Sequence, residues 1–296
     1  MTHRFEQLLN SKTIIVGDGA MGTLLQAAGL ERGACGESWN LEKPDAVVKI
    51  HQYYVDAGSD FILTNTFGGS PTKLSVYGLA DRAETLNAAG VRLARKAAGD
   101  RCLVLGDLGP SGSILEPYGN AVFADLKQQY QRQIRGLLDG GVDGFIIETM
   151  MDINELRCAF DAARELSDLP IVTSMCFQEA RGVYRTMFGT SAADAAQTME
   201  AMGATVAAAN CMVEIDKYIP LVKQMREGTS LPILAQPNAG QPRLVEEKAV
   251  YDAKPETMMA WIPELVKAGA RLLGGCCGTT PDYIRLLQAW ATEYNN

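Results

Sequence analysis

The stretch FADLKQQYQRQIRGLLDGGVDGFIIE, residues 123–148, contains one complete helix-and-strand unit. Apolar side chains in its first half recur at helical spacing, which places them on one stripe of an amphipathic helix. These side chains are Phe123, Leu126, Tyr130, Ile134, Leu137 and Leu138. After a pair of glycines, residues 143–148 are apolar almost throughout, as is typical of a parallel strand that is buried on both faces. The stretch therefore predicts a helix packed on a buried strand.

The same alternation extends over the whole chain. Short apolar runs, many of them β-branched, are each followed by a longer segment with helical spacing. The predicted strands are Thr13–Gly17, Asp60–Asn65, Cys102–Asp107, Asp143–Glu148, Pro170–Cys176, Ala204–Asn210, Leu231–Pro237 and Ala270–Gly275. This number of units favours a (β/α)₈ TIM barrel, with a doubly wound open sheet as the alternative. At 296 residues the chain suits one such barrel, and we expect a single domain over residues 1–296.

Composition and charge exclude several classes of partner. The chain has 27 basic and 35 acidic residues, so a net charge of −8 disfavours nucleic acid or an anionic membrane as the main partner. No apolar run reaches the ~18 residues of a membrane helix, and the first residues lack the layout of a signal peptide. We therefore expect a cytoplasmic protein. The sequence does not indicate its oligomeric state.

Two prolines and one possible cap bear on helix boundaries. An interior proline costs a helix about 3 kcal/mol, so we expect Pro220 in a first helical turn and Pro263 at a kink. Thr280 followed by Pro281 predicts an N-cap and the first residue of the last helix.

In a barrel the residues that carry chemistry lie at the carboxyl-terminal ends of the strands. Polar or thiol side chains follow nearly every predicted strand. They are Asp18, Asn65, Asp107, Glu148, Cys211, Asn238 and the pair Cys276 and Cys277. The placement of these side chains fits the barrel prediction.

The string GGCCGTT at residues 274–280 is the most informative in the sequence. Adjacent strand residues point to opposite faces, so both sulfurs can reach one ion only where the strand ends in a turn, which the glycines permit. If Cys211 joins Cys276 and Cys277, three thiolates face one point, and zinc prefers such ligands. We therefore predict a zinc site with one position open to a substrate.

The other cysteines are predicted to have no role in the metal site. An odd total of seven with irregular spacing argues against a disulfide framework in a reducing compartment. We interpret Cys102 and Cys158 as core or helix residues, Cys35 as a loop residue, and Cys176 as the end of a strand.

A zinc site with an open position predicts thiol chemistry. A free thiol has a pKa of about 8.5, so only roughly three per cent is thiolate at pH 7, whereas zinc deprotonates a coordinated thiol. A substrate thiol activated in this way needs no protein base. This agrees with the presence of only two histidines, His3 and His51, of which His51 is expected to pack or cap within a helix.

The first turn, GDGAMG at residues 17–22, allows three interpretations. It formally matches a dinucleotide-binding fingerprint, but Asp18 would set a carboxylate where a pyrophosphate should lie. Alternatively, backbone N–H groups of the turn bind the carboxylate of an amino acid while Asp18 and Glu148 bind its ammonium group. Asp18 capping the next helix is the third interpretation. Asn210 and Asn238 either orient ligands or are turn residues.

Six motifs together resemble the homocysteine S-methyltransferase family, and most closely the N-terminal homocysteine-binding module of its cobalamin-dependent branch. They are DGAMGT (18–23), TNTFGG (64–69), IIET (146–149), NC (210–211), PNAG (237–240) and GGCCGTTP (274–281). The resemblance implies that Cys211, Cys276 and Cys277 bind zinc and that the homocysteine sulfur is the fourth ligand. Asn238 matches the asparagine that holds the open position without substrate. Asp18 and Glu148 match the residues that bind the amino group, and Gly19, Ala20 and Met21 match the backbone near the carboxylate.

The resemblance implies methyl transfer to homocysteine, giving methionine, with methylcobalamin as the donor. We expect the methylcobalamin on a separate corrinoid protein, because the chain ends at Asn296 without a corrinoid segment. S-methylmethionine or a related sulfonium is the alternative donor. The segment Met212–Ile215 replaces the small turn usual in the family, which leaves open another thiol as acceptor. A nicotinamide oxidoreductase and a non-catalytic thiol-binding or corrinoid-binding barrel remain as other classes.

Overall fold

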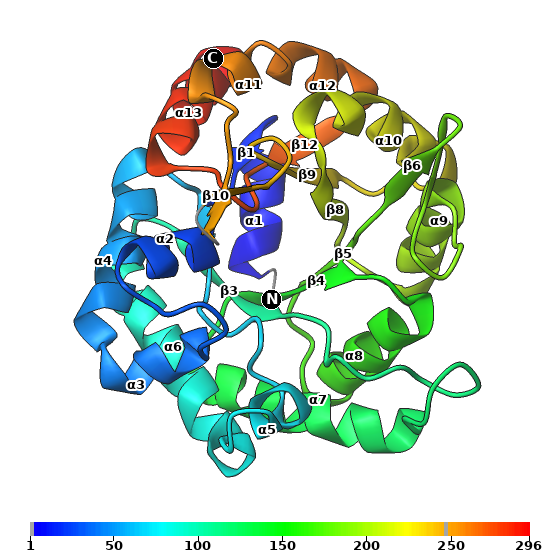
Figure 1. The fold of residues 1–296 in the computed structure, drawn as a ribbon. Helices are drawn as coiled ribbons and strands as arrows, with labels where there is room; N and C mark the ends of the chain where they lie inside the picture. Colours follow the sequence, from blue (N-terminus) through cyan, green and yellow to red (C-terminus); the bar gives the residue numbers. More distant parts are fainter. Residues whose placement is uncertain (1–2, 246–247) are drawn as a thin grey trace.

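The protein is a closed barrel of parallel strands surrounded by helices (Figure 1). The computed structural model describes residues 3–245 and 248–296. Eight parallel strands form the central sheet in the order β1-β12-β9-β8-β5-β4-β3-β2. Their bounds are β1 Ile15–Val16, β2 Phe61–Leu63, β3 Leu103–Leu108, β4 Gly144–Met150, β5 Ile171–Met175, β8 Val206–Glu214, β9 Ile233–Asn238 and β12 Ala270–Leu273. Each of these strands overlaps one of the predicted strands, so the predicted (β/α)₈ TIM barrel is confirmed.

Helices follow the strands around the outside of the barrel. The α-helices are α1 Arg4–Ser11, α2 Met21–Ala27, α3 Trp39–Glu42, α4 Pro44–Ala57, α5 Pro71–Ser75, α6 Ala83–Ala98, α7 Phe123–Gly140, α8 Ile153–Leu166, α9 Ala192–Met202, α10 Ile215–Gly228, α11 Pro255–Met259, α12 Ile262–Ala268 and α13 Pro281–Asn295. Short 3₁₀ helices lie at Gly36–Ser38 and Ala80–Arg82. Two antiparallel hairpins, which the sequence analysis missed, are β6 Gln178–Ala180 with β7 Val183–Arg185, and β10 Arg243–Val245 with β11 Lys248–Val250. No helix in the described ranges has both the length and the apolar character that crossing a membrane requires.

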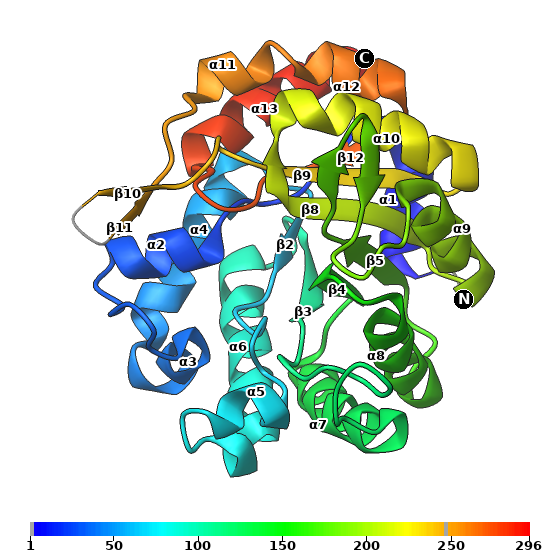
Figure 2. The same ribbon diagram turned by 45° about the vertical axis from the view of Figure 1, so that its right-hand side comes forward.

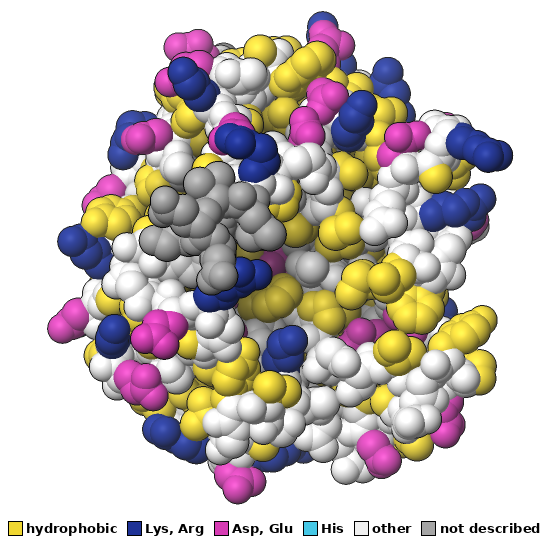
Figure 3. Space-filling model, in the orientation of Figure 1, with side chains coloured by type: hydrophobic (Ala, Val, Ile, Leu, Met, Phe, Trp, Pro, Cys, Tyr) yellow, Lys and Arg dark blue, Asp and Glu magenta, His cyan; other side chains and the backbone are white. Residues whose placement is uncertain are grey.

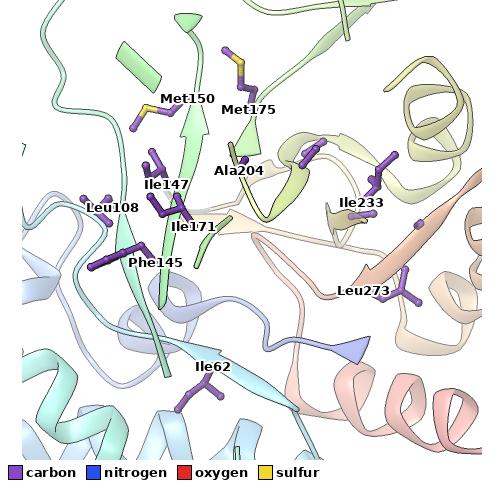
Figure 4. Packing of buried hydrophobic residues seen from close by; sticks show 14 of the residues in the cluster. Ile62, Leu108, Phe145, Ile147, Met150, Ile171, Met175, Ala204, Ile233 and Leu273 are labelled. Atoms are coloured by element: carbon purple, nitrogen blue, oxygen red, sulfur yellow. The ribbon is translucent and has the colours of Figure 1, made fainter. Parts of the chain in front are cut away.

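The strands are buried on both faces, as their apolar sequences predict. In β4, Phe145 and Ile147 belong to the outer cluster that packs against the helices, whereas Ile146 belongs to the cluster inside the barrel. Figure 4 shows the outer cluster, with Phe145 and Ile147 beside Leu108 of β3. Because successive strand residues point to opposite faces, burying both faces requires an apolar run without alternation.

The helix α1 closes the amino-terminal end of the barrel. Phe5 and Leu9 belong to the inner cluster, and the Phe5 ring meets the Phe61 ring edge-on at a centroid distance of 6.0 Å. Figures 1 and 2 show that α1 and the β10–β11 hairpin lie at opposite ends of the barrel. The carboxyl-terminal ends of the strands are therefore the open end.

The seam between β1 and β2 is held by Asp60. Its backbone N–H donates to the Val16 carbonyl at 2.7 Å, and its Oδ2 accepts from the Val16 N–H at 2.9 Å. The Lys12 ammonium pairs with the other carboxylate oxygen of Asp60. The backbone and the side chain of one residue thus join the two outermost strands of the sheet.

The proline positions differ from the sequence expectation. Pro220 lies inside α10, where the helix continues through it, and Pro263 lies in the first turn of α12. The kink expected at Pro263 is replaced by a break, because α11 and α12 are separate helices. A proline in a first turn removes no helical hydrogen bond, so this position is the favourable one. The predicted start of the last helix is correct, since the Thr280 side chain accepts from the Tyr283 N–H and Pro281 is the first residue of α13.

His51 packs within the fold, as expected. It lies on α4, is 0% exposed, and neither ring nitrogen has a hydrogen-bond partner among the described residues. Burial without a partner disfavours the charged imidazolium and lowers the pKa of His51 to about 4. The folded chain therefore holds this side chain neutral at pH values at which the unfolded chain protonates it.

We predict that replacing His51 by leucine changes the pH dependence of stability. Unfolded His51 binds a proton below about pH 6.5, whereas folded His51 binds one only below about pH 4. The wild type therefore loses stability relative to the variant as the pH falls from about 6.5 to about 4. The difference in the free energy of unfolding should change by about 1.4 kcal/mol per pH unit. Urea unfolding of both proteins at pH 5, 6 and 7 measures it, and a pH-independent difference would contradict the prediction.

Candidate active site

A cavity of about 400 Å³ opens at the carboxyl-terminal end of the barrel. Figure 3 shows this face of the molecule, which is hollowed near its middle with hydrophobic side chains along the edge. Most of the predicted site residues line the cavity. They are Asp18, Gly19, Ala20, Met21, Glu148, Cys211, Cys276 and Cys277. Asn210 and Asn238 do not line it, and both are buried.

Three cysteine sulfurs meet at the wall of this cavity. The sulfurs of Cys211, Cys276 and Cys277 all lie within 4.8 Å of one another, and the Cys211 and Cys277 sulfurs are 3.8 Å apart. All three residues are partly accessible. Residues from two distant parts of the sequence are therefore brought to one point, in a donor set of the kind that zinc prefers.

The vicinal cysteines reach this point because the strand ends before them. β12 ends at Leu273, and the next residues turn along the end of β9. The Cys276 N–H donates to the Pro237 carbonyl at 2.9 Å, and the Ala239 N–H donates to the Cys277 carbonyl at 2.9 Å. A side chain at Gly275 would meet the Thr279 hydroxyl at 2.3 Å, so only glycine fits there. The predicted turn is therefore packed too closely for any other residue.

Cys211 reaches the cluster through an irregularity in its strand. The sequence predicted a strand end at Asn210, but β8 continues to Glu214 with a register shift between these two residues. Cys211 and Met212 have φ angles of 63° and 62°, in the left-handed region. Such a bulge re-aims a side chain relative to the regular pleat. The strand thus changes direction at Cys211, and its side chain points toward the other two cysteines.

The remaining cysteines lie outside the cluster, as predicted. Cys35, Cys102, Cys158 and Cys176 are all buried. The Cys176 thiol donates to the Asn210 carbonyl at 3.1 Å and so lies directly behind the strand that carries Cys211. It is adjacent to the cluster without being part of it.

The three sulfurs share hydrogen bonds. Bonds from the Cys276 and Cys277 thiols lower the pKa of Cys211 to about 3, because they stabilise its thiolate. The same bond to Cys211 raises the pKa of Cys276 and of Cys277 above the usual range. The shared hydrogen bonds therefore favour one thiolate within the cluster, and a thiolate is the form that binds a metal ion.

Asn238 offers an oxygen beside the cysteines. Its side chain hydrogen-bonds to the Cys211 sulfur. Its Oδ1 is buried and has no hydrogen-bond partner within residues 3–245 and 248–296. A buried amide oxygen without a partner is costly unless a ligand or ion satisfies it. This atom therefore fits a labile oxygen donor to a metal ion.

Asn210 is engaged differently. Its Oδ1 accepts from the Thr149 N–H at 2.9 Å and from the Ser174 hydroxyl at 2.7 Å. Its Nδ2 donates to the Thr149 hydroxyl at 2.7 Å and lies 3.9 Å from the Cys276 sulfur. The amide thus ties β4, β5 and the cysteine turn together. These hydrogen bonds position Asn210, and its contact with substrate stays a prediction.

Three buried carboxyl groups face the cavity without a basic partner. Asp18, Asp107 and Glu148 line it, and none forms an ion pair with a side chain in the described part of the chain. Burial raises the pKa of Asp18 and of Glu148 to about 8, and burial together with these two neighbours raises the pKa of Asp107. The cluster therefore lacks a positive charge that a ligand can supply.

Asp107 and Gln236 were missed as site residues. The sequence analysis noted Asp107 at a strand end but assigned it no role, and it did not single out Gln236. Gln236 lines the cavity, and its Oε1 is buried with no hydrogen-bond partner among the residues described. The available signal was a polar residue inside an apolar strand, two positions before Asn238 and therefore on the same face.

The first turn presents backbone N–H groups to the cavity wall. The Ala20 N–H is already bonded to the Thr279 hydroxyl at 3.2 Å. Ala20 is also the N-cap of α2, and its side chain supplies no acceptor. The first N–H groups of a helix have no partner within the helix, so those of Met21 and Gly22 remain for an anion or water.

Comparisons with known proteins identify the family of the chain. Residues 15–291 match the family described as Homocysteine S-methyltransferase. Methionine synthase of Mycobacterium tuberculosis is 32% identical over 94% of this chain, and that of Mycobacterium leprae is 31% identical over 97%. The chain spans about a quarter of the length of these relatives, 25% in each case. The fold is similar to that of the metallated homocysteine methyltransferase MmuM of Escherichia coli, with a TM-score of 0.81, 24% identity, and coverage of 97% of this chain and 99% of that one. The chain belongs to the homocysteine S-methyltransferase family.

Proposed function

We propose that this chain is a zinc-dependent methyltransferase that methylates the thiol of homocysteine and so forms methionine, and that residues 1–296 act as one homocysteine-binding module. The observation that carries the proposal is the convergence of three cysteine sulfurs, within 4.8 Å of one another, on a cavity that also holds three unpaired carboxyl groups. Membership of the family supports the reaction class. A nicotinamide cofactor would need a phosphate-binding turn, whereas the Asp18 carboxyl is buried in this one.

The donor set fits zinc with one position left for another ligand. Cys211, Cys276 and Cys277 would hold the ion, and the unpartnered Asn238 oxygen would complete the set without substrate. Bound zinc would keep the thiol of homocysteine deprotonated at neutral pH. No side chain then has to act as a general base. This agrees with the location of His51 outside the cavity lining.

The carboxyl groups and the first turn would hold the amino acid part of homocysteine. Its ammonium group is the cation that Asp18, Asp107 and Glu148 lack. Its carboxylate would bind the N–H groups at the start of α2. With its ammonium and carboxylate groups bound, homocysteine directs its sulfur toward the cysteines. This fixed orientation lowers the entropy cost of bringing the sulfur and the methyl group together.

The reaction balances without an oxidant or reductant. A carbon–sulfur bond forms between the homocysteine thiolate and the methyl carbon, and the bond from the methyl group to its donor breaks. The donor keeps that electron pair, and the thiol proton is released to solvent. The chain's contribution is to hold the acceptor sulfur in line with the incoming methyl group and to limit the access of water.

We propose a methylcobalamin-carrying corrinoid protein as the methyl donor. Relatives named methionine synthase support this choice, because the matched segment covers only 25% of each of them and the rest of their length can carry other functions. S-methylmethionine or a related sulfonium is the alternative donor. The unusual segment Met212–Ile215 keeps another thiol as an alternative acceptor. All three cases use an acceptor thiolate that zinc would activate in the same way.

We predict that replacing Cys276 by serine abolishes zinc binding and methyl transfer. A hydroxyl is a poor zinc ligand, and Cys276 lies in a turn outside the core, so the barrel should still fold. Metal content per chain and circular dichroism measure the two effects. In the wild type, zinc X-ray absorption should show the number of sulfur neighbours rise from three to four when homocysteine is added, as the three cysteines of the cluster predict.

Cys176→Ser is the matched control for this prediction. Cys176 is buried behind β8 and lies outside the cluster, so its replacement should leave zinc content unchanged. A Cys276→Ser protein that retains full zinc, or a loss of zinc from the Cys176 variant alone, would contradict the assignment.

We predict that Asp18→Asn and Asp107→Asn each weaken homocysteine binding by about 10- to 100-fold, because each removes a charged partner of the ammonium group. Zinc content should not change. Titration calorimetry on the zinc-loaded proteins measures the affinity. The control ligand is 4-mercaptobutyrate, which has the thiol and carboxylate but no amino group. Its affinity should be similar in all three proteins, and an equal loss for both ligands would disprove the ammonium role.

We predict that the zinc-loaded protein forms methionine from homocysteine with methylcobalamin as a minimal donor, and more slowly with S-methylmethionine. Chromatographic detection of methionine measures the rates. Faster transfer from S-methylmethionine would reverse the order of the two donors. Zinc and homocysteine binding without turnover from either donor would favour the non-catalytic alternative.

A further inference from the structure

The three cysteine sulfurs of the chain face the same cavity as the acceptor sulfur would. Cys211, Cys276 and Cys277 all line the cavity, and all three are partly accessible. In the proposed function each would be a thiolate, which is the form of a thiol that attacks carbon. A methyl group in the cavity would therefore meet three sulfurs of the protein besides that of homocysteine. Methyl transfer to homocysteine requires that the protein sulfurs react more slowly.

Each of the three sulfurs has a side-chain hydrogen-bond donor of its own. The pairs of donor and sulfur are the Asn210 amide with Cys276 at 3.9 Å, the Asn238 amide with Cys211, and the Tyr251 hydroxyl with Cys277. A hydrogen-bond donor stabilises a thiolate and lowers its basicity, and a less basic thiolate attacks carbon more slowly. The donors therefore lower the reactivity of the protein sulfurs.

Tyr251 is the one of these donors that the sequence analysis did not single out. It follows β11 directly, is partly buried, and is not among the residues that line the cavity. A tyrosine hydroxyl has a pKa of about 10, so it carries its proton at neutral pH and can donate it to a sulfur. Tyr251 therefore reaches the Cys277 sulfur from outside the cavity, where it does not contact a substrate.

The structure fixes the position of the Tyr251 ring. A Cβ built at Gly278 would lie 2.2 Å from the Tyr251 Cγ, so the ring lies directly against the backbone that follows Cys277. The Ala253 N–H donates to the Ala239 carbonyl at 3.1 Å, and the Ala239 N–H donates to the Cys277 carbonyl at 2.9 Å. The segment that carries Tyr251 is thus connected to the cysteine turn by its backbone as well as by its ring.

We propose that Tyr251 is a positioning residue whose hydrogen bond keeps the Cys277 sulfur unreactive and so directs the methyl group to homocysteine. The inference rests on the proposed function, because it concerns which sulfur accepts the methyl group. In the side reaction a carbon–sulfur bond would form at Cys277, the bond from the methyl group to its donor would break, and the donor would keep the electron pair. The thioether product lacks the negative charge of a thiolate ligand.

The experiment compares wild type with Tyr251→Phe, which retains the ring and removes only the hydroxyl. Tyr53→Phe, on the exposed surface of α4, is the matched control. The zinc-loaded full chain is treated with methyl iodide without homocysteine, and mass spectrometry of peptides gives the methylation rate at each cysteine. We expect Tyr251→Phe to raise the rate about tenfold at Cys277 and to leave Cys211 and Cys276 nearly unchanged. Tyr53→Phe should match wild type.

Two further measurements distinguish this role from a structural one. Competition with a chelator measures how firmly each protein holds zinc. A turn that is merely loosened in Tyr251→Phe would release zinc more easily and would be methylated faster at all three cysteines. With cobalt in place of zinc, the sulfur-to-metal charge-transfer band should move to longer wavelength in Tyr251→Phe, because one sulfur loses a donor. Faster methylation at all three cysteines, an unmoved band, or equal rates at Cys277 in both proteins overturns the proposal.

The same reaction with homocysteine present separates this inference from the proposed function. Wild type should form methionine, whereas Tyr251→Phe should also accumulate a methyl group on Cys277. If wild type binds zinc but forms no methionine, the proposed function fails, and a rise confined to Cys277 in the variant still supports the hydrogen bond. If wild type forms methionine and the variant methylates Cys277 no faster, only the inference about Tyr251 fails. A wild type that binds no zinc overturns both.

Discussion

The contact between the first and last strand ends determines both the barrel and the site. The Gly17 N–H donates to the Leu273 carbonyl at 2.8 Å, which pairs β1 with β12. One step further, the Gly275 N–H donates to the Asp18 carbonyl at 2.9 Å. The Thr279 hydroxyl continues the contact by accepting from the Ala20 N–H. The hydrogen bonds that join the first strand to the last therefore also set the Asp18 carboxyl beside the cysteine turn.

A consequence of this arrangement is that the site is costly to the folded chain. Burial raises the pKa of Asp18 and of Glu148 to about 8, above their values in an unfolded chain. These groups therefore stabilise the fold most at low pH and lose that contribution as pH rises from about 4 to 8. His51 has the opposite effect, since its lowered pKa favours the fold as pH rises. Near neutral pH, a bound ammonium group would offset the cost of the carboxylates.

The sequence predicted the parts of the fold that follow from periodicity. Strands buried on both faces are apolar without alternation, so all eight barrel strands were recognisable. The turn at the vicinal cysteines was also predictable, because two adjacent strand residues point to opposite faces and cannot share an ion. Short polar hairpins such as β6–β7 have no such pattern and were missed. The kink expected at Pro263 was wrong because Met258 and Ile262 keep a helical spacing across the break between α11 and α12, which only tertiary packing reveals.

The site was predictable only where residue chemistry is distinctive. Cysteines and a carboxylate in a glycine-rich turn attract notice, whereas Asp107 and Gln236 are common residue types. Their significance comes from lacking partners in a buried space, which depends on the whole fold. Asn210 shows the reverse case, because its position beside Cys211 suggested a ligand contact while its amide is satisfied by Thr149 and Ser174. Sequence position alone does not reveal which hydrogen bonds are already made.

The cysteine centre also depends on backbone strain held by its surroundings. Cys211 and Met212 both adopt the left-handed region, which costs a residue other than glycine about 1–3 kcal/mol. The Tyr218 hydroxyl holds the Cys211 carbonyl at 3.0 Å, and the Gln241 amide holds the Met212 carbonyl at 3.3 Å. These hydrogen bonds hold the conformation in which the Cys211 sulfur faces the other two cysteines. The backbone strain is therefore offset by contacts within the chain, and the direction of the sulfur follows from the course of β8.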